Sequence, residues 1–159
     1  MMKIRQRSHL EISLEEYLHK HIPISSAMGV SVDLASNNQI ILSAPFANNI
    51  NHKKTVFGGS LHAVSTLACW SLLHLNLFNL LGENIQIVIA SSEVEYLAPV
   101  TTDFKAECSM PDVLDWEKFL KMLQRKGKAR LKLHATILQE DRLCVNYSGV
   151  FVAINTHFK

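Results

Sequence analysis

Residues 51–81 read NHKKTVFGGSLHAVSTLACWSLLHLNLFNLL, and most expectations about the fold follow from them. A polar, basic lead-in gives way to Phe57-Gly58-Gly59-Ser60 and then to a long, mostly apolar segment. No Asp, Glu, Lys or Arg occurs from Thr55 to Gly82. Because strand-like sequence lies on both sides, this segment is expected to form one helix buried on nearly every face. A buried helix start leaves backbone N–H groups unsatisfied, so chemistry is expected at the glycine-rich entrance.

Composition indicates a single domain over residues 1–159 with no nucleic-acid partner, because charged residues are 19% and the net charge is only +2. The basic run at residues 121–132, KMLQRKGKARLK, is interpreted as a solvated helix end and strand start. Cys69, Cys108 and Cys144 form no CxxC pair, which favours reduced thiols in a cytoplasmic protein. No His or Cys pair has metal-ligand spacing, so we expect neither a metal nor a cofactor.

The apolar segment also raises the question of a membrane span. Residues 63–81 have about the length that crosses a bilayer, whereas the N-terminus is too polar for a signal peptide. Polar side chains that are costly in lipid argue against a span, and they are Ser65, Thr66, Ser71, His74, Asn76 and Asn79. We therefore expect a core helix and no membrane partner.

The remaining elements follow from hydrophobic periodicity and turn residues. A short helix is expected over residues 13–21, with Ser13 and Glu16 as a capping box. Strands are expected over residues 29–35, 39–45, 85–97, 103–110, 128–139 and 142–154, and an amphipathic helix is inserted at about 112–126. This order predicts an α+β fold, with an antiparallel sheet wrapped around one long central helix. Periodicity leaves the strand order open.

Four stretches carry a resemblance to a known family: Asn51, the FGGSL at 57–61, the LACW at 67–70 and the EYLAPV at 95–100. Together they resemble the hot-dog thioesterase superfamily, and more narrowly the thioesterase domain of the YiiD C-terminal type, over residues 10–154. The resemblance implies the hot-dog fold and a homodimer, possibly a tetramer, whose sheets join edge to edge. It also implies acyl-thioester substrates on coenzyme A or acyl carrier protein, bound between subunits near the start of the central helix.

Thioester hydrolysis needs a polarised carbonyl, a stabilised oxyanion and an activated water or nucleophile. Gly58 and Gly59 can offer bare N–H groups to a carbonyl that approaches closely, because neither carries a Cβ. The alternative is that both glycines only let the helix enter the sheet. The resemblance implies substrate-binding roles for Phe57, Gly58, Ser60 and His62, while the sequence leaves open whether His62 faces the entrance or the packing.

The resemblance implies catalytic roles for Asn51, Gly59, Ser65 and Thr66. Asn51 matches the polar residue that orients water or the thioester, although it can equally be a turn residue. Many hot-dog thioesterases carry an Asp or Glu about two turns into the central helix, where this chain has Ser65 and Thr66. The absent carboxylate leaves the general base open.

Other candidates come from outside the central helix. Glu93 and Glu95 could supply the missing carboxylate or form an exposed strand end, whereas Asp103 fits a surface turn. Lys53, Lys54 and Arg130 are candidate contacts for coenzyme A phosphates, and His52 could contact a phosphate, act as a base or lie free in a loop.

Three functions remain in competition. The first is an acyl-thioester hydrolase, and the second is a non-catalytic acyl-thioester binding or regulatory module. The third, a hydratase or dehydratase, needs a facing His and carboxylate pair that the sequence does not place.

Overall fold

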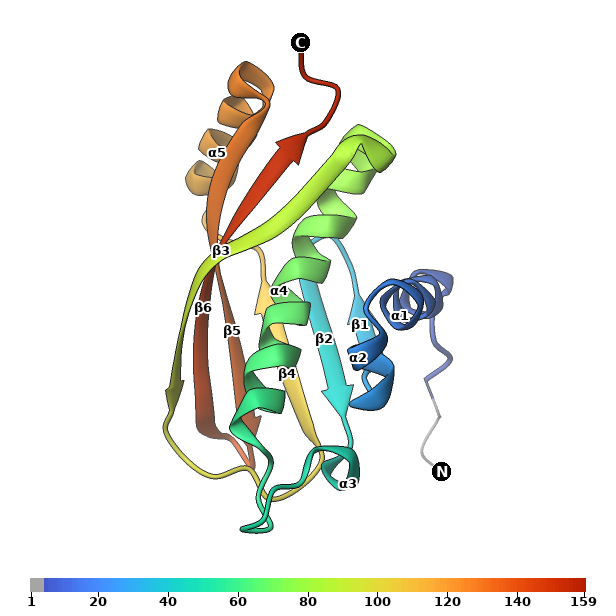
Figure 1. The fold of residues 1–159 in the computed structure, drawn as a ribbon, viewed down its shortest axis with the longest axis vertical. Helices are drawn as coiled ribbons and strands as arrows, with labels where there is room; N and C mark the ends of the chain where they lie inside the picture. Colours follow the sequence, from blue (N-terminus) through green and yellow to red (C-terminus); the bar gives the residue numbers. More distant parts are fainter. Residues whose placement is uncertain (1–4) are drawn as a thin grey trace.

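A curved antiparallel sheet wraps around one long helix in the computed structural model, which describes residues 5–159 (Figure 1). The sheet has six strands, and the smaller helices lie at its margins. In chain order the elements are α1 (His9–His21), α2 (Pro23–Ala27), β1 (Ser31–Ala35), β2 (Gln39–Ala44), α3 (Phe46–Asn49), α4 (Gly58–Leu81), η1 (Gly82–Asn84), β3 (Ile85–Tyr96), β4 (Phe104–Ser109), α5 (Val113–Lys126), β5 (Lys128–Gln139) and β6 (Arg142–Asn155). The predicted α+β architecture is confirmed.

The central helix α4 is buried on more than one face, as its uncharged sequence predicts. It packs on β2, β3, β4, β5 and β6, and Leu72, Leu73 and Leu77 are fully buried. With η1 it is long and apolar enough to cross a bilayer by length and composition, yet half of that window is buried inside the protein. Packing against the sheet therefore accounts for its apolar composition. The helix stops at Gly82, whose φ of 60° suits glycine.

The strand order is β1-β2-β4-β5-β6-β3, and every neighbouring pair is antiparallel. Helix α4 crosses the concave face, so β3 lies at one edge of the sheet while β4 returns beside β2 (Figure 1). The 12-residue β3 has a strand neighbour on one side only, namely β6. A long strand therefore has a free edge next to the start of α4.

The sheet also has an opening within it, between its two middle strands β4 and β5. Strand β4 pairs only with residues 135–137 of β5, so the first half of β5 has no strand on that side. Helix α5 lies there, begun by the side-chain cap of Asp112 and ended by Gly127 with a φ of 67°. Its buried residues Phe119 and Leu123 hold it against the sheet. The amphipathic helix expected at about 112–126 is thus α5.

The expected start of the first helix is wrong. Two Ser-x-x-Glu spacings compete near the first helix, and the upstream one is used: Ser8 and Glu11 form the reciprocal capping box, while Ser13 lies inside α1. The upstream box starts the helix four residues earlier and lets Glu11, which is only 1% exposed, pair with Arg5. Short helices α2 and α3 occur in addition to the helices and strands predicted from the sequence.

The capping box gives a stability prediction. We expect Glu11→Ala to lower the free energy of unfolding by about 1–3 kcal/mol, because the Ser8 N–H and Arg5 lose their acceptor. Glu11→Gln keeps an acceptor for the box and should cost less. Ser13→Ala is the matched control and should change stability by less than about 0.5 kcal/mol. Urea unfolding measures all three, and a larger loss for Ser13→Ala than for Glu11→Ala would contradict the assignment.

Candidate functional site

The start of α4 presents two backbone N–H groups that no other group within residues 5–159 engages. Phe57 is the N-cap residue and supplies no side-chain cap. The N–H groups of Ser60 and Leu61 donate to the Phe57 carbonyl at 3.0 and 3.2 Å. Those of Gly58 and Gly59 have no acceptor within residues 5–159. The positive end of the helix dipole and two bare donors therefore coincide.

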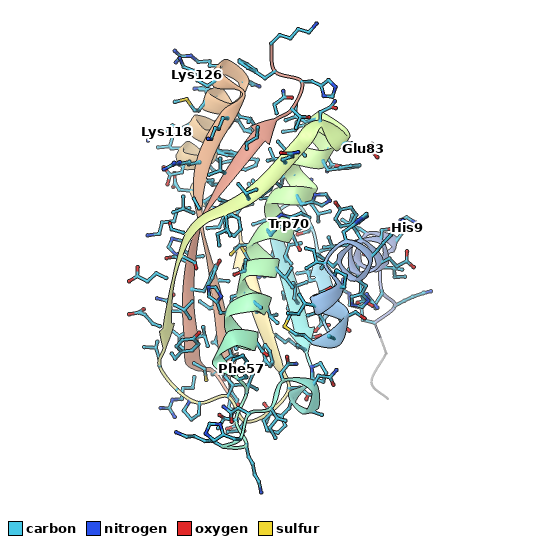
Figure 2. The ribbon with its side chains drawn as sticks, viewed as in Figure 1. His9, Phe57, Trp70, Glu83, Lys118 and Lys126 are labelled. Carbon is cyan, nitrogen blue, oxygen red and sulfur yellow. The ribbon has the colours of Figure 1, made fainter. Side chains whose placement is uncertain are left out.

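Two aromatic rings flank these donors without sealing them. Phe57 is 58% exposed, and Tyr96, at the end of β3, is 55% exposed while its hydroxyl donates to the Gly58 carbonyl at 3.0 Å. A Cβ added to Gly59 would lie 2.3 Å from the Phe57 ring, so glycine is what lets that ring rest on the backbone. A Cβ on Gly58 would lie 3.4 Å from the Tyr96 ring, an ordinary contact. Gly59 itself is exposed, and Figure 2 shows Phe57 at this end of α4.

The loop before the entrance is held by Asn51. Its Oδ1 accepts from the N–H groups of Lys53 and Thr55, and its Nδ2 donates to the Thr55 hydroxyl at 2.9 Å. The structure thus gives Asn51 the turn role that the sequence left as an alternative. The Phe57 N–H donates to the Asn49 carbonyl at 2.7 Å, which pins the entrance to α3. The catalytic role of Asn51 stays a prediction.

A row of polar side chains continues from the entrance along α4. His62 Nε2 lies 2.9 Å from the Ser92 hydroxyl on β3. One turn later the Thr66 hydroxyl lies 2.9 Å from the His62 carbonyl oxygen and 2.9 Å from the Tyr147 hydroxyl on β6. Burial raises the pKa of Tyr147 to about 12, although its hydrogen bond with Thr66 acts in the opposite direction. Tyr147 is therefore a neutral partner at ordinary pH.

Sequence reasoning missed Ser92, Tyr96 and Tyr147 as site residues. Tyr96 lay within the EYLAPV stretch, which offered a signal through the resemblance only. Ser92 lies in the polar second half of β3, where the sequence analysis considered only Glu93 and Glu95. Tyr147 gave no signal, because in the sequence it is one more inward position of an alternating strand.

Ser65 and Thr66 are adjacent in sequence but face different surroundings. Ser65 is fully buried, and its hydroxyl has no hydrogen-bond partner within the described residues. Thr66 is half-buried and joins the row with His62. Adjacent residues of a helix point about 100° apart, so the structure brings Thr66 but not Ser65 toward the row. Ser60, beside the glycines, is buried as well.

The carboxylates of β3 point away from the entrance. Ser92 and Tyr96 contact α4, so alternation along the strand turns Glu93 and Glu95 to the opposite face. Glu95 accepts there from the Asn146 side chain at 2.8 Å. Asp103 accepts from the Phe46 N–H at 2.8 Å, which is a structural role in a turn. Within residues 5–159, no carboxylate hydrogen-bonds to the polar row.

The three cations expected to contact coenzyme A phosphates do not lie close together. Lys53 and Lys54 are in the loop before α4. Arg130 pairs across β6 with Val88, which is eight residues along β3 from Tyr96 at the entrance, or roughly 26 Å. They do not form one site within a single chain. His52 is exposed in the loop.

A separate groove of about 850 Å³ lies between α1 and the second half of α4. Its wall includes the stacked rings of Tyr17, Trp70 and His74, and Figure 2 shows Trp70 midway along α4. Burial, with a contribution from His21, lowers the pKa of His74 and so favours its neutral form. Such a groove suits an apolar chain or ring.

The remaining candidate groups do not form a reactive centre. All three cysteines are free and buried, and burial raises the pKa of Cys69, with neighbouring Cys108 adding to the effect. A thiol of this kind is inert rather than nucleophilic. In the part of the chain that the structure describes, no three His, Cys, Asp or Glu residues are placed to hold a metal ion.

Comparison with known proteins identifies the family. Residues 11–155 match the family model described as "Putative thioesterase (yiiD_Cterm)". A structure from Shewanella oneidensis, described as a "putative thioesterase", is 32% identical, with a TM-score of 0.80 and coverage of 91% of this chain and 97% of that one. A protein of unknown function from Chlorobaculum tepidum is 31% identical, with a TM-score of 0.81 and coverage of 91% and 94%.

A more distant structure shares the fold alone. It is a thioesterase from Haemophilus influenzae, 14% identical with a TM-score of 0.70 over 99% of this chain and 98% of that one. The shared architecture agrees with a sheet wrapped around a central helix. The chain therefore belongs to the YiiD C-terminal family of hot-dog thioesterases.

Proposed function

We propose that the protein hydrolyses acyl thioesters carried on coenzyme A or on acyl carrier protein. The observation that carries this proposal is the pair of unengaged N–H groups at Gly58 and Gly59, flanked by exposed aromatic rings. Donors fixed at a helix start stabilise the oxyanion that forms when a thioester carbonyl is attacked. Removing one such donor typically costs about 10²–10³ in rate, so these amides are central to the proposal.

His62 is the general base in this proposal. It lies three residues after Gly59, so the two share one side of the helix. A neutral imidazole takes a proton from water, whose oxygen attacks the thioester carbonyl carbon. The C–S bond then breaks, and the imidazolium returns the proton to the leaving thiolate. Ser92 holds the His62 ring, and Thr66 holds its backbone carbonyl, so both are positioning residues.

Asn51 keeps a supporting role here, because its loop leads into the glycines. A catalytic role for Ser65 remains a prediction from the resemblance alone. The aromatic groove beside Trp70 is the place we propose for an apolar acyl tail, since it lies on the same helix about 17 Å beyond Gly59.

The acting species in this proposal is a homodimer joined through β3, and two dimers can associate into a tetramer. Strand β3 has a free edge on which Val88 is 49% and Ile89 is 42% exposed. A long, apolar free edge is a template for pairing with another strand. A second copy would cover that edge and the exposed rings of Phe57 and Tyr96. Free, buried cysteines favour the cytoplasm as the place of action.

A non-catalytic acyl-thioester binding module is the second candidate. The observation that favours it is the position of Glu93 and Glu95, which face away from the entrance. A hydrolysis screen from acetyl to palmitoyl thioesters on both carriers separates the two functions. Turnover supports hydrolysis, whereas tight calorimetric binding without turnover supports the module. Absence of both would overturn the proposal.

The oxyanion role predicts a difference between two substitutions at one position. Gly59→Pro removes the N–H, while Gly59→Ala adds a comparable Cβ against Phe57 and keeps the N–H. We expect kcat/KM of the proline variant to fall about 10²–10³ below that of the alanine variant. Circular dichroism checks that both fold, and equal activities would exclude the Gly59 amide as the donor.

The general-base role predicts a second pair of results. His62→Gln should lower kcat by about 10²–10⁴ with little change in KM, because the proton acceptor is lost. His52→Gln, in the exposed loop nearby, is the matched control and should retain full activity. Ser92→Ala should cost only about tenfold, since it releases the ring without removing the base. A fully active His62→Gln variant would end this assignment.

The dimer predicts a change in molecular mass. Light scattering at micromolar concentration should give twice the mass of one chain, or four times if dimers pair. Val88→Asp on the β3 edge should shift the protein toward monomer and reduce turnover. Val113→Asp, at a position on α5 that is 68% exposed, is the matched control and should leave the mass unchanged. A monomeric wild-type protein would contradict the proposal.

A further inference from the structure

A second large hollow lies at the far end of the sheet from the glycine entrance. It is a groove of about 840 Å³ between α5 and the first half of β5. Figure 2 shows Lys118 and Lys126 on α5 at this end of the protein. The groove is lined by Asp115, Lys118, Phe119, Met122, Lys126, Lys128, Ala129, Arg130, Leu131 and Lys132.

The lining shows that this groove follows the edge of a strand. Five consecutive residues of β5, 128–132, all line it. Side chains of a strand alternate between its two faces, so one hollow can meet five in a row only along the strand edge. That edge is open because β4 pairs no further than residues 135–137 of β5. The five residues extend over roughly 17 Å.

The open edge carries hydrogen-bonding groups that lack partners. In an antiparallel pair, alternate residues turn their N–H and C=O groups away from the neighbouring strand. Residues 128–133 pair with β6 on one side, so every second residue directs its backbone groups toward the groove. Within residues 5–159, no hydrogen bond reaches the backbone of 128–133 from outside its own sheet. The edge therefore offers donors and acceptors in alternation.

The rim of the groove is strongly basic. Five cations line it, against the single carboxylate of Asp115, which leaves a formal charge of +4. The whole chain carries only +2. The salt bridges among the described residues lie elsewhere, at Arg5, Arg7 and Lys105, so none neutralises this rim. The basic cations are Lys118, Lys126, Lys128, Arg130 and Lys132.

The floor of the groove is apolar. Phe119 is buried, and beside it lie Leu131 and the partly exposed Met122. Lys128, Arg130 and Lys132 are exposed on one face of β5, while Ala129 and Leu131 are buried on the other. A strand laid on this edge would therefore meet cations at every second position and apolar groups between them.

We propose that this groove binds an extended acidic peptide segment of a partner protein, which adds to β5 as a strand. Its acidic residues stand at alternate positions, opposite the three β5 cations, with small apolar residues between them. A peptide backbone can form hydrogen bonds with both the donors and the acceptors that alternate along this edge. Phosphate groups only accept, so they would leave the carbonyl groups of β5 unpaired. The inference does not depend on the proposed hydrolysis.

The probe is a fluorescein-labelled peptide with the sequence Glu-Val-Glu-Val-Glu, titrated with the wild-type protein in fluorescence polarisation. Micromolar binding that weakens at least tenfold between 50 and 500 mM salt, on the order expected for several exposed charge contacts, is the expected result. N-methylation of alternate amides should abolish binding, because it removes the strand hydrogen bonds. A Lys-Val-Lys-Val-Lys peptide should not bind.

Two double variants with equal changes in net charge serve as the matched test. Arg130→Glu with Lys132→Glu should weaken peptide binding at least tenfold. Lys121→Glu with Arg125→Glu alters exposed residues of α5 that do not line the groove, and should change affinity less than threefold. Peptide binding should also slow amide hydrogen exchange in residues 128–133.

Three results would overturn the proposal. They are equal losses in both double variants, undiminished binding of the N-methylated peptide, or no peptide binding at low salt. Displacement of the peptide by micromolar pyrophosphate, together with unchanged exchange at residues 128–133, would instead make the groove a phosphate site.

Discussion

The burial of α4, an uncharged helix of 24 residues, determines how the other elements are arranged. The hydrophobic surface of α4 is not confined to one stripe, so no single flat sheet can cover it. The sheet curls around the helix instead, and the chain must cross the concave face to continue. That crossing places β3 at the far edge and gives the sheet its strand order.

The same burial creates the candidate site. A wrapped helix has to begin where the chain enters the sheet, and its first N–H groups cannot be satisfied within the helix. In the part of the chain that the structure describes, neither a capping side chain nor a loop residue accepts a hydrogen bond from these N–H groups. The neighbouring bonds of Phe57 to Asn49 and of Val56 to Val100 fix the backbone, so the free donors of Gly58 and Gly59 are held in place. Preorganised donors are what oxyanion stabilisation requires.

Two unpaired strand edges, along β3 and along the first half of β5, arise from different causes. Strand β3 is an edge because no other strand within residues 5–159 lies beside it on its outer side, and Val88 and Ile89 are exposed along it. The opening beside β5 exists because β4 is short and α5 fills the remaining space incompletely. One edge is apolar and the other is basic, so the two are suited to different partners.

Much of this architecture could be predicted from residue patterns alone. Alternation in Phe104, Ala106 and Cys108 marked the inner face of β4, and β5 was predicted with its observed bounds. Glycines 58 and 59 marked the helix entrance. The first helix was misplaced because two Ser-x-x-Glu spacings compete locally, and the contact of Glu11 with Arg5 favours the upstream one.

The sequence by itself therefore determined the class of fold, the buried helix and the glycine entrance. These follow from local hydrophobic periodicity and from the absence of Asp, Glu, Lys and Arg between Thr55 and Gly82. Only the tertiary structure decided which strands are neighbours and which side chains meet at the entrance. Ser92, Tyr96 and Tyr147 contact residues of α4 that lie 30 to 81 positions away in the sequence, through contacts that no local pattern encodes. The basic run at residues 121–132 was interpreted from the sequence as solvated surface, whereas the tertiary structure places several of its cations on the rim of an open strand edge. Only the strand pairing shows that β4 ends before the first half of β5.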